Sequence, residues 1–210
     1  MARLGRPRAF DREAALHTAM LVFWERGYEA TSTTELSAAI GINPPSLYAA
    51  FTNKENLFRE AIGHYEATEA AVSRQAMNAA PDVRSAVAAL LHGSVDQFTA
   101  DGKPHGCMIV QAAANCTADH ESVRDFALRC RARTKSVIKE RLERAVAEGE
   151  LAAEVDTERI AAFYTTFLNG VSVQARDGAP RAQLHALVDM AMAAWDASLA
   201  APSAVGPATA

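Results

Sequence analysis

The chain has 210 residues, of which 21 are Lys or Arg and 25 are Asp or Glu, giving a formal net charge of −4, and 50% of its residues are hydrophobic. This length fits one large domain or a small domain joined to a larger one, and no segment resembles a signal peptide or reaches the roughly 18 apolar residues of a membrane span. Its three cysteines are too few, and odd in number, for a disulfide framework, so we expect a cytoplasmic protein.

The charge is unevenly distributed along the chain. A negative total argues against a nucleic-acid partner, but the distribution of charge matters more than its sum. Residues 1–9 hold Arg3, Arg6 and Arg8 without any acidic residue. We therefore expect residues 1–9 to form a flexible basic arm ahead of the first helix.

The first predicted helix has a clear start and a clear end. Asp11 is a plausible N-cap, and Gly27 ends the helix. Its apolar residues recur at helical spacing: Leu16, Ala19, Met20 and Phe23.

Two short helices follow. Ser32-Thr33-Thr34-Glu35 matches a capping box, in which the Ser hydroxyl and the Glu carboxylate each accept a backbone N–H, and this helix runs to about Ile40. Gly41 can adopt the left-handed conformation that a helix end requires. Asn43 can then cap a helix over residues 44–51, because proline suits the first helical position, where no N–H is needed.

Beyond residue 51 the pattern remains helical. Thr52 to Glu55 has the form of another capping box and starts a long fourth helix that extends to about Ala80. Further helices are predicted over residues 83–98, 106–115, 123–149, 160–171 and 184–195. No strand-period alternation of useful length occurs, so the predicted fold class is all-α with nine helices, and residues 201–210 are expected to be a disordered tail.

Residues 32–51 have the form of a helix-turn-helix, in which one helix braces and the next enters the major groove of DNA by its N-terminal end. The first turn of the second helix carries residues that can approach base edges: Asn43, Pro44, Pro45 and Ser46. Leu47 and Phe51, four residues apart, are expected to point into a small core. The alternative is that these two helices only belong to the core of a larger helical bundle.

Neighbouring positions can bind the phosphates of the DNA backbone. Tyr48 is expected on the outer face, Thr33 and Thr34 stand at another helix N-terminus, and Lys54 supplies a positive charge. Such contacts position a protein on DNA without specifying a sequence.

Together these residues resemble the N-terminal signature of the TetR family of repressors. The resemblance covers about residues 10–65 and rests on Gly27-Tyr28, Thr31-Ser32-Thr33-Thr34, Leu36, Gly41-Ile42-Asn43, Ser46-Leu47-Tyr48, Phe51, Asn53-Lys54-Glu55 and Leu57-Phe58. It implies an obligate homodimer that binds double-stranded operator DNA and releases it when a small molecule enters the C-terminal domain. It also implies DNA contacts at Thr33, Thr34, Pro44, Pro45, Ser46, Tyr48 and Lys54.

The sequence departs from the family pattern at Ala49 and Ala50, where family members often carry a His and another aromatic residue that touch DNA. The resemblance therefore does not imply an operator preference. The arginine arm, including Arg6, can compensate for fewer polar side-chain contacts by reaching into a minor groove.

The chain is thus expected to have two domains, a DNA-binding domain over residues 10–65 and an effector-binding and dimerising domain over residues 66–200. The last two predicted helices have broad apolar faces that can pack against their symmetry mates as a four-helix bundle. The alternative is that both faces only meet the core of the same chain.

The helices of the second domain are expected to enclose a pocket for a small-molecule effector, lined mainly by apolar and aromatic groups. The candidate lining residues are Phe98, Cys107, Met108, Gln111, Phe126, Phe163, Phe167 and Gln174. Each is also compatible with ordinary core packing, because any helical bundle needs aromatic residues at helical spacing. None identifies a ligand, and no cofactor is predicted.

A more specific hypothesis concerns the reactivity of Cys107. It stands at a predicted helix start, where the helix dipole tends to lower the pKa of a thiol, and His105 adds partial positive charge. An electrophile- or oxidant-sensing Cys107 fits this position, and similar Gly-Cys positions occur in redox-responsive members of the family; the alternative is a buried small apolar residue. Cys116 lies on the opposite face of the same predicted helix, so a disulfide would need Cys130 or a second subunit.

Other chemistries are less well supported. The pairs His105-x-Cys107 and Cys116-x-x-x-His120 have metal-ligand spacing, but no carboxylate cluster accompanies them, and no metal site is predicted. No phosphate-binding loop, nucleophile elbow or paired general-acid carboxylates occur, so the chain is not predicted to be an enzyme.

The sequence therefore predicts a transcriptional repressor that a small-molecule or electrophile effector releases from its operator. Effector binding would tilt the fourth helix and change the separation of the two recognition helices. The sequence is also compatible with a transcriptional activator, because whether a regulator represses or activates a gene depends on where its operator lies.

Overall fold

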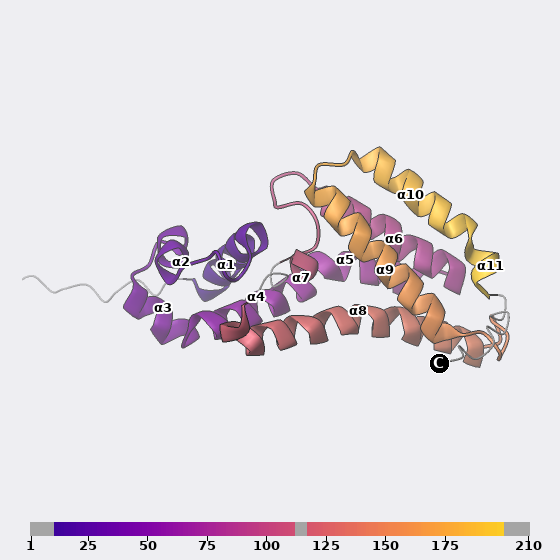
Figure 1. The fold of residues 1–210 in the computed structure, drawn as a ribbon, viewed down its shortest axis with the longest axis horizontal. Coiled ribbons are helices and arrows are strands. Elements are labelled where there is room, and N and C mark those ends of the chain that lie inside the picture. Colours follow the sequence, from indigo (N-terminus) through magenta and orange to yellow (C-terminus); the bar gives the residue numbers. More distant parts are fainter. Residues whose placement is uncertain (1–10, 112–116, 200–210) are drawn as a thin grey trace, which may run out of the picture.

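A computed structural model describes residues 11–111 and 117–199, and within these ranges the chain is helical without a strand (Figure 1). The elements are α1 (Arg12–Arg26), α2 (Thr33–Ile40), α3 (Pro44–Phe51), α4 (Lys54–Ala67), α5 (Glu69–Ala79), α6 (Val83–Phe98), α7 (Met108–Gln111), a 3-10 turn (Ala118–His120), α8 (Glu121–Ala147), α9 (Thr157–Arg176), α10 (Arg181–Ala193) and α11 (Trp195–Leu199). The predicted all-α class is confirmed. The predicted basic arm, the predicted tail and Cys116 lie outside the described residues.

The predicted caps of the N-terminal helices are present. Asp11 accepts the backbone N–H groups of the first turn of α1, and Ser32 and Glu35 form the reciprocal capping box of α2. Gly41 ends α2 with a φ of 78°, in the left-handed region, and Asn43 caps α3 through its side-chain oxygen. Local hydrogen bonds therefore fix where these helices begin and end.

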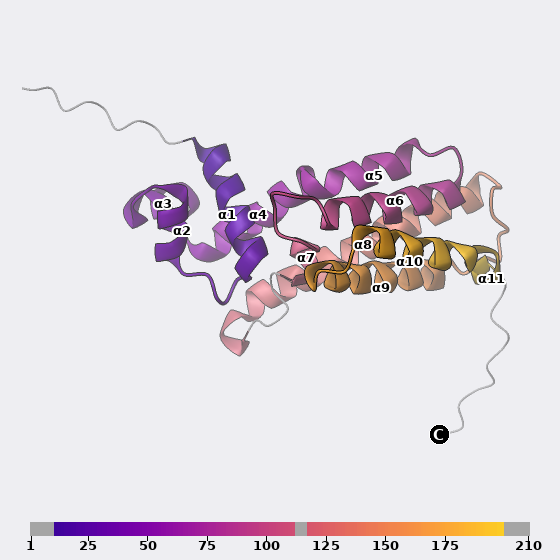
Figure 2. The ribbon, with the colours of Figure 1, turned by 90° about the horizontal axis from the view of Figure 1, so that it is seen from above.

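The chain is divided more finely than the nine predicted helices. The expected long helix from residue 54 to about residue 80 breaks at Thr68, whose hydroxyl donates to the carbonyl oxygen of His64 at 2.8 Å. Such bonding from Thr to the preceding turn competes with helix continuation and bends helices. The break lets α5 turn and pack along α6 (Figure 2).

Three other boundaries differ from the prediction. The N-cap of α4 is Asn53, whose side chain accepts from Asn56 N, and Thr52 does not form the expected capping box. The last predicted helix ends at Ala193, and Trp195 begins the separate α11. The described part of the predicted helix over residues 106–115 is only the four-residue α7, because residues 112–116 are not described.

Two apolar cores hold the molecule together. The first contains the aromatic side chains Phe23, Trp24, Tyr28 and Phe58 and extends to Met108. It also includes buried residues at the start of α8: Val123, Ala127 and Cys130. The second core joins α6, α8, α9 and α10. These cores support the proposed division near residue 65, although α7 and the first turns of α8 pack with the N-terminal domain.

No helix of the described residues is long and apolar enough to cross a membrane.

Thr52, between α3 and α4, is the only residue other than glycine in the described part of the chain with a positive φ. Its φ of 64° and ψ of −55°, together with the hydrogen bond from Asn53 N to Phe51 O at 2.7 Å, form a three-residue turn of the strained γ type. Thr52→Gly should therefore raise the free energy of unfolding by about 1 kcal/mol, since glycine relieves more strain than it adds in chain entropy. Urea unfolding at fixed protein concentration would measure this.

Thr52→Ala is the matched control, because alanine also removes the hydroxyl but keeps the unfavourable φ. It should leave the unfolding midpoint close to that of the parent chain. Equal stabilisation by glycine and alanine would contradict strain at this turn.

Candidate nucleic-acid interface, internal cavity and outer helical face

The start of α3 presents a polar and conformationally fixed surface to solvent. Asn43 Oδ1 accepts a hydrogen bond from Ser46 N at 2.9 Å and so caps α3. The two prolines take the first helical positions, where the missing N–H of proline costs no hydrogen bond. Asn43, Pro44 and Pro45 are exposed, and Ser46 is half-buried. This turn therefore has the outward orientation that the sequence predicts.

The other large side chains of α3 are divided between the core and the surface. Leu47 and Phe51 are 2% and 1% exposed, whereas Tyr48 is 46% exposed. Thr34 is exposed and Thr33 half-buried at the start of α2. Most of the predicted contact residues of the helix-turn-helix are thus exposed or half-buried at the surface, and Arg6 lies outside the described residues.

Two cation–aromatic contacts brace this surface. The Lys54 ammonium lies 4.1 Å from the centroid of the Tyr28 ring, and the Arg12 guanidinium lies 4.7 Å from that of Phe51. Arg12 also bonds to Glu60 at 2.6 Å. Sequence analysis missed the contacts of Arg12, because no local pattern pairs residues so far apart in the chain.

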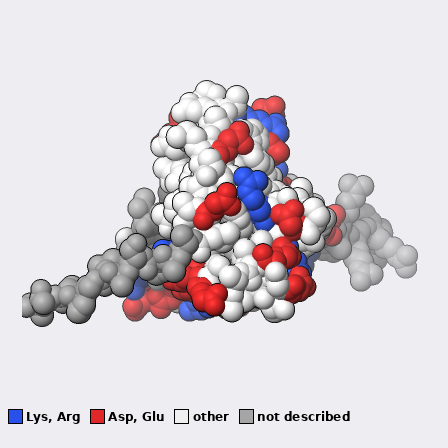
Figure 3. Space-filling view, turned by 90° about the vertical axis from the view of Figure 1, so that its right-hand side faces the viewer, with Lys and Arg blue, Asp and Glu red and all other residues white. Residues whose placement is uncertain are grey.

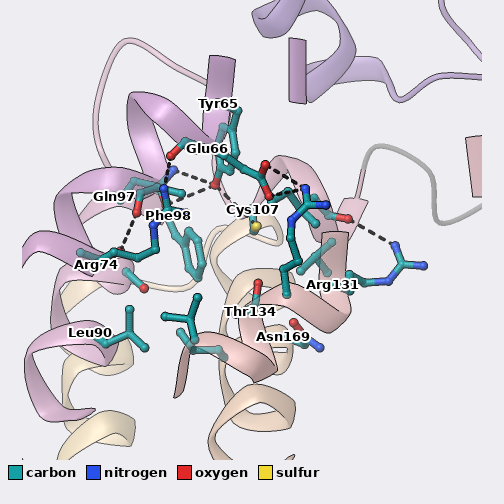
Figure 4. A pocket seen from close by; sticks show the side chains of 18 residues that line it. Tyr65, Glu66, Arg74, Leu90, Gln97, Phe98, Cys107, Arg131, Thr134 and Asn169 are labelled. Atoms are coloured by element: carbon teal, nitrogen blue, oxygen red, sulfur yellow. Dashed lines mark hydrogen bonds and ion pairs between the residues drawn. The ribbon is translucent and has the colours of Figure 1, made fainter. Parts of the chain in front are cut away.

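A cavity of about 220 Å³ lies among α4, α5, α6, α8 and α9, in contact with the residues that lead into α7 (Figure 4). Its lining residues are Tyr65, Glu66, Ala70, Ser73, Arg74, Leu90, Ser94, Gln97, Phe98, Cys107, Ile109, Val110, Arg131, Arg133, Thr134, Val137, Leu168 and Asn169. Nine of these eighteen side chains are polar or charged, and the rest give the cavity the apolar surface that is usual in a small-molecule site.

A buried polar chain crosses one side of the cavity. Gln97 Nε2 donates to the Tyr65 hydroxyl oxygen at 3.0 Å, and this hydroxyl lies 3.5 Å from Cys107 Sγ. Burial raises the pKa of Tyr65 well above its ordinary value, so Tyr65 stays protonated. Glu66 bonds to Arg133 at 2.8 Å, and Figure 4 shows Glu66 beside Tyr65 and Cys107.

Cys107 is not the activated thiol that the sequence suggests. Burial raises its pKa, and the backbone N–H groups of Ile109 and Val110, which favour the thiolate, do not compensate. The expectation of a lowered pKa is therefore wrong, because the sulfur is desolvated.

Gly106 fixes the position of Cys107 against α9. Its φ is 78°, and a Cβ built there would lie 2.0 Å from Gln111 Nε2 and 2.6 Å from Ser172 O. The absence of a side chain lets Cys107 N donate to Ser172 Oγ at 2.8 Å.

Only two of the predicted effector residues, Phe98 and Cys107, line this cavity. Met108 is fully buried in the N-terminal core, and Phe126 packs edge-on against Phe58 in the same region. Gln111 donates to the carbonyl oxygen of Ser172 at 3.3 Å. These three residues do not line the cavity, and their role in effector binding stays a prediction.

The other three predicted effector residues lie on α9 but not at the cavity. Phe163 and Gln174 are exposed, and Phe167 is half-buried. Helical spacing identifies an apolar face but not the neighbour that covers it, which is why the sequence did not separate these residues from those that line the cavity. Tyr65 and Gln97 were missed, although a polar side chain on an apolar helix face was an available signal.

The outer face of α9 and α10 is largely apolar. Phe163 is 46% exposed, Val173 45% and Met190 70%. Gly170 lies in the middle of α9 with no atom within 4 Å of a Cβ built there, so nothing within the chain requires glycine. Seen from the end of the molecule that carries α11, the upper part of the surface shows mainly uncharged side chains (Figure 3).

Ion pairs connect the N-terminal domain to α8 and α9. Arg176 near the end of α9 bonds to Glu25 at 3.1 Å, and Glu29 accepts from Thr117 N and from His120 Nδ1 at 2.8 Å each. The hydrogen bond from the Thr117 backbone, with those from the Thr117 and His120 side chains, lowers the pKa of Glu29. Helix movements in the second domain are thus linked to the end of α1.

Comparison with known proteins gives concordant matches over both regions. Residues 15–61 match the sequence model described as bacterial regulatory proteins, tetR family, and residues 84–188 match the tetracyclin repressor-like C-terminal domain. The HTH-type transcriptional repressor ComR of Escherichia coli (strain K12) is 33% identical over 91% of each chain. The HTH-type transcriptional repressor BdcR of the same strain is 30% identical over 89% of this chain and 90% of that protein.

A solved structure is also similar throughout its length. The regulator CifR, as a cysteine mutant complexed with 26-base-pair double-strand operator DNA, is 48% identical with a TM-score of 0.87, covering 90% of this chain and all of that one.

The raised pKa of Cys107 predicts slow alkylation. Less of this thiol is ionised at pH 7 than in an unperturbed cysteine, so iodoacetamide should modify it several-fold more slowly than a cysteine peptide, and the rate should rise with pH through the alkaline range. Mass spectrometry would follow each cysteine separately, with Cys107→Ser as the control for assignment. A rate already at its plateau near pH 7 would contradict a raised pKa.

Proposed function

This chain belongs to the TetR family of bacterial regulatory proteins, and we propose that it acts as a repressor that leaves operator DNA when a small molecule or electrophile occupies the cavity beside Cys107. It is a DNA-binding transcriptional regulator, and its relatives are regulators, not enzymes. The outward-facing start of α3 above buried Leu47 and Phe51 is the observation that carries the proposal. The proposed compartment is the cytoplasm, where such a regulator meets DNA.

The DNA contacts are proposed for the exposed side of the helix-turn-helix. Asn43, Pro44, Pro45 and Ser46 would enter the major groove, because their short or fixed side chains allow close approach to base edges. Thr33, Thr34, Tyr48 and Lys54 would hold phosphates, and the arm with Arg6 would reach a minor groove. The similarity to CifR, which has been solved in complex with operator DNA, supports DNA binding by this domain.

A homodimer through the outer face of α9 and α10 is the proposed assembly. Two copies of this face would form a four-helix bundle around a two-fold axis. Covering Phe163, Val173 and Met190 removes apolar surface from water. Gly170 fits a point where the backbones of two helices approach closely, which explains a glycine that has no role within the chain.

The effector is expected to be small. At about 220 Å³ the cavity falls below the usual range of drug-sized pockets. Four charged side chains line it: Glu66 pairs with Arg133, whereas Arg74 and Arg131 bond to the backbone carbonyl oxygens of Glu66 and Ile109. Because three guanidinium groups and one carboxylate line the cavity, a compact amphipathic molecule that is neutral or negatively charged fits better than a cation.

The protonated Cys107 suits a selective electrophile response. A thiol with a raised pKa reacts slowly with dilute reagents, but a compound held in the cavity is presented to it at high effective concentration. Cys107 would therefore react with molecules that first bind the cavity.

The signal is proposed to travel through α4. Its first residue, Lys54, lies at the DNA-binding surface, and Tyr65 near its other end lines the cavity. A ligand that displaces Tyr65 or separates Glu66 from Arg133 would tilt α4 and move both α3 helices of a dimer. Such a ligand shifts the population only if it binds the tilted form more tightly.

Replacing Tyr48 by Phe and Lys54 by Ala in one chain should weaken operator binding about tenfold or more, because each copy loses a hydrogen bond and a charge to phosphate. Duplexes selected from a random pool by the parent protein would serve as operator, and fluorescence anisotropy at several salt concentrations would measure affinity. The salt dependence should also become less steep.

Lys135→Ala is the matched control, because Lys135 lies on α8 and bonds to Glu158. It should leave DNA affinity unchanged. Unaltered affinity of the Tyr48 and Lys54 variant, with its dimer intact, would remove these residues from the interface.

Met190→Asp should raise the dissociation constant of the homodimer about a hundredfold, because each copy would bury an unpaired carboxylate. Sedimentation velocity over a concentration series would detect the monomer. Val72→Asp on α5, where valine is 64% exposed, is the control and should remain dimeric. If Met190→Asp dimerises like the parent chain, the interface lies elsewhere.

A further inference from the structure

The segment that leads into α8 is fastened to the N-terminal domain by one carboxylate. Glu29, in the turn between α1 and α2, accepts hydrogen bonds at Oε1 from Thr117 N at 2.8 Å, Thr117 Oγ1 at 2.9 Å and His120 Nδ1 at 2.8 Å. Because the pKa of Glu29 is lowered, first by the bond from the Thr117 backbone, this carboxylate is ionised and only accepts hydrogen bonds. His120 therefore carries its hydrogen on Nδ1, and this bond fixes the orientation of its ring.

A second attachment joins the start of α8 to α4. Arg59 Nη2 donates to the carbonyl oxygen of Ser122 at 3.3 Å and to Glu55 Oε1 at 2.6 Å. The guanidinium of Arg59 also lies 4.7 Å from the centroid of the Phe126 ring. The first turns of α8 are therefore held by the N-terminal domain at two places.

The ring of His120 lies edge-on against Tyr28. The two centroids are 5.1 Å apart, and the ring planes are inclined by 75°. Tyr28 is 4% exposed and also contacts Phe23 and Phe58, with centroids 6.2 Å and 5.1 Å away. Phe23 and Phe58 belong to the N-terminal domain, whereas His120 brings a contact from the segment that leads into α8.

The Tyr28 ring also holds the ammonium group of Lys54, which lies 4.1 Å from the ring centroid. A lysine carries its charge on a flexible stem, so binding a phosphate costs it conformational freedom. A ring that already holds the ammonium lowers this cost. Because an ammonium has three N–H donors, contact with the ring on one side is compatible with a phosphate oxygen on another.

We propose that Tyr28 is a positioning residue for DNA binding and that His120 sets the position of its ring from the start of α8. Tyr28 keeps the Lys54 ammonium where it meets a phosphate, and Glu29 keeps His120 against Tyr28. This role rests on the proposed function, in which Lys54 contacts DNA.

Helix α8 connects this arrangement to the cavity. It has 27 residues and extends from the N-terminal domain along the second domain (Figure 1). Its middle part lines the cavity with Arg131, Thr134 and Val137. Because a helix moves as a rigid element, a ligand that displaces this part of α8 also displaces its first turn and His120. Such a displacement changes a phosphate contact without moving α3, and so differs from the proposed tilt of α4.

The alternative role of Tyr28 is packing alone. In that role, replacing Tyr28 weakens DNA binding only through the fold, and by the same factor whether or not Lys54 is present. In the positioning role, the effect of Tyr28 disappears when Lys54 is removed. A double-mutant cycle with DNA affinity as the readout separates the two roles.

The cycle uses Tyr28→Leu, Lys54→Ala and the double variant of the full chain, with duplexes selected from a random pool by the parent protein. Fluorescence anisotropy should show Tyr28→Leu binding about three- to tenfold more weakly than the parent, because each copy loses a cation–aromatic contact. In the Lys54→Ala background the same replacement should change affinity by a factor close to one. An equal loss in both backgrounds would show that Tyr28 acts by packing alone.

Trp24→Leu is the matched control for this cycle. Trp24 is a buried aromatic residue of the same core, but its ring contacts Tyr65 at the other end of α4. Any effect of Trp24→Leu on DNA affinity should be the same with and without Lys54. If it depends on Lys54 as strongly as Tyr28→Leu does, the coupling reflects a general loosening of the core, and the positioning role is wrong.

Variants of His120 test the link to α8 at a half-buried site, where folding is less at stake than at Tyr28. His120→Ala should weaken DNA binding about twofold, and only when Lys54 is present, because one ring contact of Tyr28 is lost. His120→Phe should restore most of the affinity, since it keeps a ring against Tyr28. Ser136→Ala, at an exposed position of α8, should have no effect. If His120→Phe binds DNA as weakly as His120→Ala, or His120→Ala binds like the parent, His120 does not position Tyr28.

NMR of the chain labelled with carbon-13 lysine tests the contact in the absence of DNA. The ε-methylene protons of Lys54, assigned with Lys54→Ala, should be shifted upfield by the ring current of Tyr28. The shift should vanish in Tyr28→Leu, whereas Lys139, which pairs with Glu143 and Glu158, should not change.

This measurement also separates two kinds of failure. Without an upfield shift in the parent chain, Tyr28 does not hold Lys54, and the positioning role is overturned even if Lys54→Ala weakens DNA binding. If the shift is present but Lys54→Ala leaves DNA affinity unchanged, the proposed DNA contact of Lys54 has failed, and the positioning role falls with it.

Discussion

The burial of one face of α4 is the constraint on which the rest of the structure depends. Leu57, Phe58, Ala61, Ile62 and Tyr65 are all buried, and they hold α4 against α1 while its last turn reaches the cavity. Removing this apolar surface from water fixes the helix as one rigid element that belongs to both ends of the molecule. Any change in its direction is therefore shared by the DNA-binding surface and the cavity wall.

The N-terminal domain could be predicted well from the sequence because the hydrogen bonds that start its helices are local. Asp11, Ser32 and Asn43 each satisfy backbone N–H groups within three residues, so the positions of α1, α2 and α3 can be read without knowing the fold. The break at Thr68 could not be read in the same way. Its hydroxyl bonds to His64 O, but Thr18 makes the same kind of bond to Ala14 O within the unbroken α1. Which threonine ends a helix therefore also depends on the packing of a second helix, here α6 against α5, and periodicity describes one helix at a time.

The cavity was the least predictable part for the same reason. Phe163 and Phe98 have similar helical context, yet one is exposed on α9 and the other lines the cavity. Cys107 shows a competition of two effects that sequence cannot weigh: a helix start favours the thiolate, whereas burial disfavours it, and burial prevails. Deciding between them requires knowing how much protein surrounds the sulfur.

The contact at Gly106 gives the thiol a mechanical role of its own. The backbone there lies so close to Ser172 that a hydrogen bond from Cys107 N–H to the serine hydroxyl holds Cys107 against α9. An adduct on the sulfur that needs room must therefore push on the same helix whose other side carries Gly170 and Val173. Chemical modification would in this way press on the face of α9 that we propose for the homodimer.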